Sequence, residues 1–408
     1  MHRSAGVVAA SVFLLSVTAA AQEQVVLTEA DALARLTPES PRVRAIRAAV
    51  DVARAEGLAA GRWPNPRIAF NRESVAGITE DITTVGQSLP ITGRRGLERH
   101  AASSLLAATS SRVGEELRRA RADLRLAFAD LIAAQTRERE LARARDHLQE
   151  LAQILARRES AGDAAGFDRL RAEREVLDIE ADRVVAAIDR GRAQAALAGF
   201  FAGPSDPSMF IAAESPAATP SLPALETLVD HAQKVRGELL ALGQEIEAAR
   251  FAARAARRRV IPEPEVIAGT KSSTAAGGDV GGVVSVQAVI PLFDRAGPER
   301  ALAQARAGQA EARAEAFRVA LRSQIASLRV AAVERRAAAD RYRSGAVGSV
   351  AEVERIAQVS YEAGERGILE LLDAYRIGTT ARVRQAVLDA AARQAEIELE
   401  FASGWEIP

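Results

Sequence analysis

The feature that most constrains the fold is an internal duplication of the sequence. The segment Val85–Arg99 shares six residues with Val286–Arg300, and each shared residue lies 201 positions after its counterpart. Farther along the chain, Ala161-Gly162 corresponds to Ala363-Gly364 at nearly the same offset. Chance similarity does not keep its register over such a distance. The chain is therefore predicted to fold as two copies of one long supersecondary unit.

A segment of different composition separates the copies. Residues 204–223 are rich in Pro, Ser and Ala and are predicted to link repeat 1 (22–203) to repeat 2 (224–408). Each repeat has the same internal order: a helical stretch (27–61 and 224–259), a Pro-x-Pro break, two short extended segments and a long helical hairpin. This order predicts a mainly α fold with a small β part.

The extended segments alternate between apolar and polar residues. In 283–290, apolar side chains occupy every second position from Val284 to Ile290, and Ser285 and Gln287 lie between them. The pattern fits a barrel wall with a wet lumen, and it equally fits an ordinary half-buried strand. The other predicted strands are 67–72, 82–89 and 265–270, and the polar segments 73–81 and 271–282 are predicted to be exposed loops.

A heptad pattern follows each pair of predicted strands. In repeat 1, apolar side chains recur every seven residues, which is typical of a coiled coil, at positions 106, 113, 120, 127, 134, 141, 148 and 155. No proline interrupts 98–160, so a helix about 100 Å long is expected from the rise per residue. A turn at Ala161-Gly162-Asp163 and a returning helix over 167–200 complete the hairpin. Repeat 2 is predicted to do the same, with a break near Gly364 and a return to Phe401.

The first residues have the pattern of a targeting segment. Met1-His2-Arg3 is a short basic start, Ala5–Ala20 is apolar or small, and Ala19-Ala20-Ala21 precedes Gln22. At about 16 residues the apolar stretch is short for a membrane-spanning helix, although an uncleaved anchor is the alternative. Residues 1–21 are therefore predicted to be a cleaved signal peptide, and the protein is expected outside the inner membrane.

The composition excludes several classes of function. The chain has 54 basic and 54 acidic residues, whereas a protein that binds nucleic acid normally carries a basic field. It contains no cysteine, so a disulfide framework, a zinc–thiolate site, a cysteine nucleophile and a lipidated cysteine are excluded. His100, His147 and His231 are isolated among Arg and Glu and are predicted to lie on solvated helix faces. We expect no enzyme activity and no cofactor.

The number of strands limits the possible architectures. Two strands per repeat give four per chain, and a four-stranded sheet cannot close into a membrane barrel. Bacterial outer-membrane barrels have about eight strands or more. Closure would therefore need several chains, and three of them would supply twelve strands and twelve helical segments.

Short motifs recur along the chain in a fixed order. They are Asn65-Pro66, Gln87-Ser88-Leu89-Pro90, Gly93-Arg94-Arg95, Ile290-Pro291-Leu292-Phe293-Asp294-Arg295, Tyr361-Glu362-Ala363-Gly364 and Leu371-Leu372-Asp373-Ala374-Tyr375. With these motifs the chain resembles the TolC-like family of outer-membrane efflux channels over nearly its whole mature length. The resemblance implies a homotrimer, with a β-barrel in outer-membrane lipid continuous with a periplasmic α-barrel tunnel. It also implies docking to a periplasmic adaptor (a membrane fusion protein) and to an inner-membrane transporter such as an RND pump.

The resemblance also implies a gate at the periplasmic tip. In the family, the closing contacts involve an Asp after the first helical turn and a Tyr and an Arg around the second. The matching residues here are Asp168, Tyr361 and Arg366, and the family's acidic rings at the constriction match Glu370 and Asp373. A threefold ring of carboxylates would attract cations and repel anions. The alternative is that these are ordinary surface charges near a turn.

The substrate is less constrained than the family. The sequences of Ile290–Arg295 and Tyr361–Arg376 most resemble those of the channels of heavy-metal exporters, so efflux of metal cations through a passive conduit is expected. Channels for drugs and other organic solutes, or for type I secretion, are the alternatives. The heptads alone would also permit a periplasmic coiled-coil scaffold without a pore.

Overall fold

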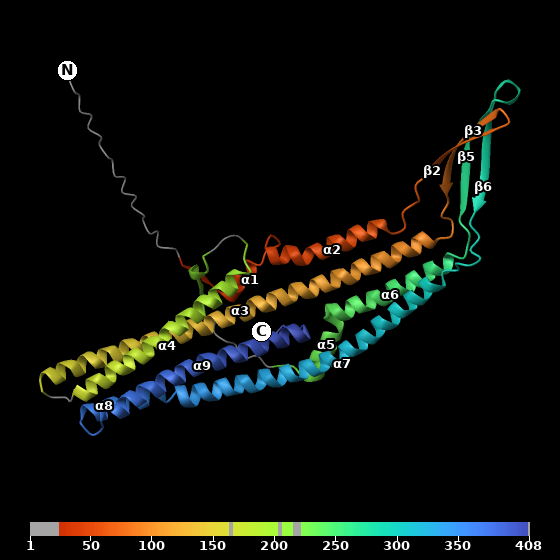
Figure 1. Ribbon diagram of the computed structural model, residues 1–408. Helices are drawn as coiled ribbons and strands as arrows, with labels where there is room; N and C mark the ends of the chain where they lie inside the picture. Colours follow the sequence, from red (N-terminus) through yellow and green to blue (C-terminus); the bar gives the residue numbers. More distant parts are fainter. Residues whose placement is uncertain (1–23, 163–165, 203–205, 215–221, 407–408) are drawn as a thin grey trace, which may run out of the picture.

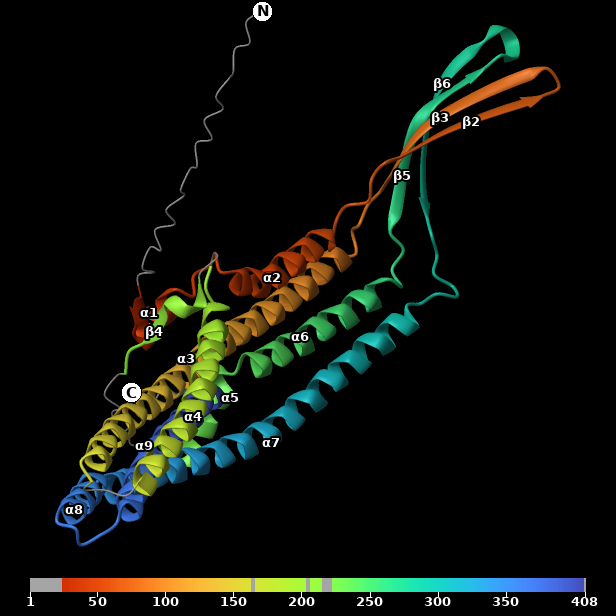
Figure 2. The ribbon, with the colours of Figure 1, turned by 60° about the vertical axis from the view of Figure 1, so that its left-hand side comes forward.

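The protein is an elongated bundle of long helices that carries a narrow sheet at one end (Figures 1 and 2). The computed structural model describes residues 24–162, 166–202, 206–214 and 222–406. The predicted signal peptide, 1–21, lies outside the described residues. Helices make up most of the chain, as the sequence predicted. Within the described residues, no helix is both long enough and apolar enough to cross a membrane.

The long helix of repeat 1 is confirmed. Helix α3 (Arg94–Ser160) has 67 residues and therefore extends about 100 Å. Five of the eight predicted heptad positions are buried, at Val113, Ala120, Leu141, Leu148 and Leu155. The helix ends before Gly162, whose φ of +84° is a left-handed conformation that favours glycine. Helix α4 (Gly166–Ala198) then returns along α3.

Repeat 2 departs from the predicted copy of this hairpin. Its outgoing helix is divided into α7 (Gly297–Tyr342), a π-helical turn over Arg343–Val347 and α8 (Val350–Glu362). The returning helix is α9 (Ile368–Ser403). The predicted break near Gly364 is confirmed, and Gly364 has a φ of +73°. The heptad pattern did not reveal the π-helical turn, because the buried seam continues on both sides of it.

All four predicted strands are confirmed, and they form one antiparallel sheet. Its order is β2 (Arg67–Val75), β3 (Ile78–Ser88), β5 (Pro264–Ser273) and β6 (Asp279–Ala288). The prediction of exposed loops over 73–81 and 271–282 is wrong in extent. Cross-strand pairing continues through the polar residues up to Val75 opposite Ile78, and to Ser273 opposite Asp279. Only Ala76 and Gly77 connect the first hairpin, both with positive φ, as a tight two-residue turn requires.

The N-terminal stretch predicted as one helix over 27–61 is also corrected. It comprises β1 (Val25–Leu27), α1 (Glu29–Ala34) and α2 (Pro41–Ala59). The Thr28 hydroxyl accepts a hydrogen bond from the Asp31 backbone N–H, and the Asp31 carboxylate accepts one from Thr28, which fixes the start of α1. Pro41 occupies the start of α2, where its missing N–H costs nothing.

The predicted linker contains ordered structure in its described part. A 3-10 turn over Pro207–Met209 leads into β4 (Phe210–Ala212), which pairs with β1 in a parallel ladder. Phe210 is almost fully buried beside Leu124 and Leu131 of α3. This strand covers the middle of α3, and its burial explains why three apolar residues interrupt an otherwise polar segment.

The helical stretch predicted over 224–259 is interrupted at Arg236. This residue has a ψ of 118° and separates α5 (Leu225–Val235) from α6 (Gly237–Arg258). The Arg236 side chain is buried, donates a hydrogen bond to the Ala402 carbonyl at 3.0 Å and lies 2.6 Å from a carboxylate oxygen of Glu115. Burial lowers the pKa of Arg236, but a guanidinium remains charged in proteins. A tertiary ion contact therefore holds the break.

Candidate functional site

The two helical turns lie at the same end of the molecule, far from the sheet (Figures 1 and 2). One apolar cluster joins the four helices that lead into these turns. Its buried members include Leu155 of α3, Ala172 of α4, Ala357 of α8 and Leu371 of α9. Because this cluster is shared, the two turns form one structural unit, which we call the tip.

The structure places all five predicted gate residues at the tip. Asp168 lies in the first turn of α4 and is half-buried, whereas Arg366 is exposed in the turn before α9. Within the described chain, neither side chain has an ion-pair partner, so a single chain does not bring Asp168 and Arg366 together. Both charges are therefore free to meet groups on another molecule.

The other three gate residues surround the second turn. Tyr361 is half-buried in the last turn of α8, with the Arg158 guanidinium 6.0 Å from its ring centre. Glu370 lies exposed in the first turn of α9, where the helix dipole favours a negative charge. Asp373 is exposed and accepts a hydrogen bond from Arg376 of the same helix at 2.7 Å. Tyr361 packs into the tip, while the acidic side chains stay in solvent.

A polar network that the sequence patterns did not predict lies just above the tip. The Arg382 guanidinium lies 2.7 Å from Glu354 and 3.5 Å from Glu140, so it bridges α9 to α8 and α3. A cavity of about 240 Å³ adjoins these groups. Glu140 is only 9% exposed. The one signal of this in the sequence was its position directly before Leu141, which belongs to the heptad column.

Tyr375 belongs to the same network. Its hydroxyl donates a hydrogen bond to Gln358 of α8 at 2.7 Å, and His147 of α3 meets its ring edge-on at 4.5 Å. Burial raises the pKa of Tyr375 to about 12, with further contributions from Glu354 and other nearby carboxylates. The hydroxyl is therefore neutral and remains a hydrogen-bond donor at any physiological pH. His147, predicted on a solvated face, has a specific aromatic partner.

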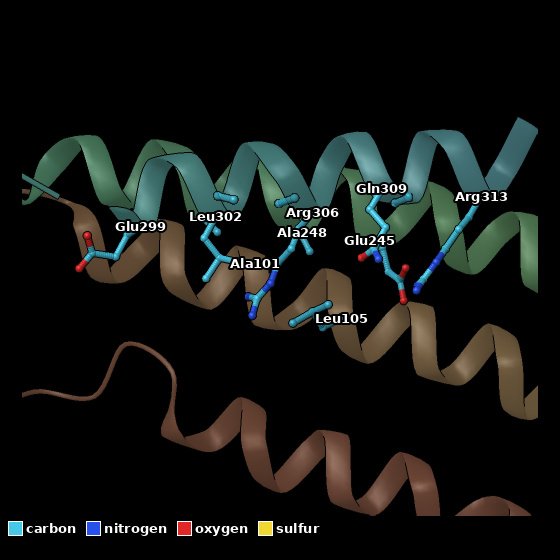
Figure 3. A pocket seen from close by; sticks show the side chains of 13 residues that line it. Ala101, Leu105, Glu245, Ala248, Glu299, Leu302, Arg306, Gln309 and Arg313 are labelled. Atoms are coloured by element: carbon cyan, nitrogen blue, oxygen red, sulfur yellow. The ribbon is translucent and has the colours of Figure 1, made fainter. Parts of the chain in front are cut away.

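A second hollow lies near the sheet end of the helices, where the first part of α3 in repeat 1 meets α6 and α7 of repeat 2. Figure 3 shows its alanine floor, with Ala101 and Ala248, and the charged side chains of Glu245, Arg306 and Arg313 around it. Its volume is about 470 Å³, and it is open along the helices. Small residues at the seam leave this trough, which contains no arrangement suited to catalysis.

The sheet has two chemically different faces, as the strand alternation predicted. The register places Ile68, Val85, Ala268 and Val284 across from one another on one face, with Ile68 77% and Val284 79% exposed. The opposite face carries polar contacts. Glu265 accepts hydrogen bonds from Arg67 at 3.3 Å and from Gln287 at 3.0 Å, and Lys271 pairs with Glu80 at 2.6 Å.

Acidic side chains of the described residues are arranged as ion pairs and not as a metal site. No group of three or more His, Asp or Glu side chains among them is arranged to hold a metal ion. Many carboxylates of the helices are instead paired with arginines, as between Arg112 and Glu238 at 3.0 Å.

The C-terminal part of the chain carries the decisive sequence similarity. Residues 228–405 match the sequence model of the outer membrane efflux protein family. Repeat 2 belongs to that family. The resemblance to TolC-like channels is thereby confirmed for this part of the chain. No curated protein sequence matches the chain at a significant level.

Solved structures of outer-membrane channels share the fold of this chain over most of its length. VceC from Vibrio cholerae has a TM-score of 0.74 at 18% identity, with 92% of this chain and 96% of that chain covered. CusC has a TM-score of 0.75 at 16% identity, with 94% and 93% covered. The open state of MtrE from Neisseria gonorrhoeae has a TM-score of 0.72 at 17% identity, with 92% and 88% covered.

Proposed function

We propose that the protein is the outer-membrane channel of a tripartite efflux system and acts as a passive homotrimeric conduit. One observation carries the proposal: a four-stranded sheet, with a band of exposed apolar side chains on one face and polar contacts on the other, stands at the end of a bundle whose longest helix extends about 100 Å. Four strands cannot close a barrel. Three copies would turn the apolar faces outward to lipid and enclose the polar faces around a lumen.

In this arrangement the tip would be the periplasmic gate. Three copies of Glu370 and Asp373 would form rings of negative charge that favour cations. Asp168 and Arg366, which lack partners within one described chain, would pair between neighbouring protomers and hold the tip closed. Exposed ion pairs of this kind contribute only about 0–1 kcal/mol each, so a docking partner could break them.

The conduit would depend on other proteins for energy. A periplasmic adaptor would dock on the helices, and an inner-membrane transporter such as an RND pump would supply the driving force. The channel itself would hydrolyse nothing. Its substrates are proposed to be heavy-metal cations, because the sequences of Ile290–Arg295 and Tyr361–Arg376 resemble those of heavy-metal exporters. Drugs or other organic solutes are the second candidate.

The gate is tested by replacing Arg366 with Ser and recording single channels in planar bilayers. We expect a higher conductance, because the inter-protomer pairs would be lost. Arg355→Ser is the matched control, since Arg355 is exposed on the same hairpin but pairs with Glu352 of its own helix, which is not a candidate gate residue. Equal conductance for wild type and Arg366→Ser would refute the gate. Conductance absent from every variant, wild type included, would refute the channel.

The substrate is tested by growth of a deletion strain on a panel of divalent metals and on a panel of drugs, dyes and detergents. Hypersensitivity to zinc, cobalt, nickel or copper alone would support metal efflux. Sensitivity to organic compounds alone would contradict the metal assignment and leave the channel unaffected. A protein that washes off outer membranes with salt would instead be a periplasmic scaffold.

A further inference from the structure

The outgoing helices of the two repeats differ in continuity at the same level of the bundle. In repeat 1, α3 is unbroken from Arg94 to Ser160, whereas repeat 2 contains the π-helical turn Arg343–Val347. There the Gly348 N–H donates to the Arg343 carbonyl at 2.9 Å, a bond that spans five residues instead of four. Such turns usually mark one extra residue inserted into an α-helix.

The positions of the buried residues show that repeat 2 contains one extra residue, because the offset between corresponding residues of the two repeats changes. Ala332 is buried and lies 201 positions after the buried Leu131. Val350 and Ala357 are also buried, but they lie 202 positions after Leu148 and Leu155. Repeat 2 therefore has one additional residue between 332 and 350. The π-helical turn absorbs it, so that α8 presents the same face to the core as the end of α3 does.

The local sequence is adapted to this irregular turn. A Cβ atom at Gly348 would lie 2.5 Å from the Ser344 carbonyl oxygen, so only glycine fits there. The Ser349 hydroxyl lies 3.0 Å from the Gly345 carbonyl and 3.1 Å from that of Ala346, and it donates to the backbone where helical bonding is disturbed. The turn is thus built to persist.

A small set of exposed charges ties the turn to α9. The Arg343 guanidinium donates to Asp340 at 2.8 Å and also to Asp389 of α9. Gln385 donates to the same Asp389 oxygen at 2.9 Å and to the Ala339 carbonyl at 3.2 Å. Since Arg343 and both carboxylates are about half exposed, these pairs add little stability and exchange readily with water.

We propose that Arg343–Val347 is a hinge at which α8 and the second turn of the tip bend relative to α7, with Arg343 as its latch on Asp389. A regular α-helix resists sharp bending, and bends concentrate where its hydrogen-bond ladder is already broken. Repeat 1 has no such break, so its hairpin is the fixed wall against which the tip of repeat 2 moves. The role of this hinge in opening rests on the proposed channel function; its existence does not.

Hydrogen exchange of the purified full-length protein tests the hinge itself. Amides of 343–353 should exchange at least about tenfold faster than those of the corresponding segment 141–151 in α3, because local opening is easier at the break. Deletion of Ala346 should remove the difference by restoring a continuous helix. Deletion of Ala144, its counterpart in repeat 1, should instead disrupt the seam and lower the Tm. Equal exchange of the two segments in wild type would overturn the proposal.

A substitution whose effect on the Tm should have opposite signs in two backgrounds gives an independent check. Gly348→Ala should lower the Tm of the wild-type chain, because its Cβ would meet the Ser344 carbonyl. In the Ala346-deletion background the same substitution should raise the Tm, because alanine is favoured over glycine in a regular helix. An effect of the same sign in both backgrounds would contradict the hinge.

The role in opening has its own readout. In planar bilayers, the Ala346 deletion should reduce the conductance gained by Arg366→Ser severalfold. A deletion that slows exchange and leaves this conductance unchanged would overturn the role of the hinge in opening. If no variant conducts at all, the channel function fails, and the exchange data still decide whether the hinge exists.

Discussion

At the scale of single residues, Glu29 connects the two repeats. This residue begins α1, and its carboxylate accepts hydrogen bonds from Arg125 of α3 and, at 3.0 Å, from Arg393 of α9. Burial by itself would raise the pKa of Glu29, but the charges and hydrogen bonds of Arg393 and Arg125 outweigh it, and the pKa is lowered from 4.5. The short N-terminal segment is thereby held onto both halves of the molecule.

The lowered pKa predicts how stability depends on pH. A carboxylate with a depressed folded-state pKa stabilises the fold above its unfolded-state pKa, near 4.5, and loses this contribution as the pH falls through the folded-state value. Glu29→Gln should therefore lower the Tm at pH 7, and the difference from wild type should shrink below about pH 4.5. Thermal melts across pH 3–8 measure this. A difference that stays constant with pH would show that Glu29 acts through packing instead of charge.

At the scale of the elements, the close crossing of α8 and α9 depends on one glycine. A Cβ atom at Gly378 of α9 would lie 2.2 Å from a carboxylate oxygen of Glu354 and 2.9 Å from the Val350 side chain. Glu354 is also the partner of Arg382 in the network above the tip. The absence of a side chain at Gly378 thus allows both the helix contact and the ion pair.

Replacing Gly378 with Ala should destabilise the protein by about 1–3 kcal/mol, because the added methyl group overpacks the crossing. Thermal unfolding measures the loss, and limited proteolysis should show faster cleavage near the second turn. Gly243→Ala in α6 is the matched control, since a Cβ there meets nothing within 4 Å. The control should be neutral or stabilising by up to about 1 kcal/mol. Equal effects of the two substitutions would refute the role of Gly378.

At the scale of the whole molecule, the sheet's two faces determine how it can be used. Val284 and Ser285 are neighbours in β6, yet they lie on opposite faces. Val284 belongs to the exposed apolar face, and Ser285 pairs with Ile267 on the face of the Glu265 contacts. The proposed barrel requires the first face to meet lipid and the second to meet water.

This requirement predicts opposite outcomes for the same substitution at adjacent positions. Val284→Arg should impair assembly, because an arginine facing lipid costs about 2–4 kcal/mol near the bilayer midplane. Ser285→Arg should assemble normally and change only the conductance. The fraction of salt-resistant protein in outer membranes measures assembly. Normal assembly of both variants would contradict the proposed orientation of the sheet.

Much of the fold follows from local sequence patterns. The heptads of α3 and the alternation in β6 each depend on residues close together in the chain, and the structure confirms both elements. The breaks at Gly162 and Gly364 were also visible, because glycine is favoured where φ is positive. The five candidate gate residues came from the motifs shared with the TolC-like family, and the structure places them all at the tip; their role as a gate stays a prediction.

Other features depend on partners that are distant in the sequence. The pairing of β1 with β4, the break at Arg236 held by Glu115, and the contact of His147 with Tyr375 join segments more than 100 residues apart. No local pattern encodes such contacts, since each side chain alone is compatible with a solvated helix face or a loop. Periodicity therefore determined which elements this chain forms, whereas tertiary packing decided where two helices are interrupted. The break at Arg236 is held by Glu115 of the other repeat, and the turn at Arg343–Val347 keeps α8 packed on the core despite one additional residue.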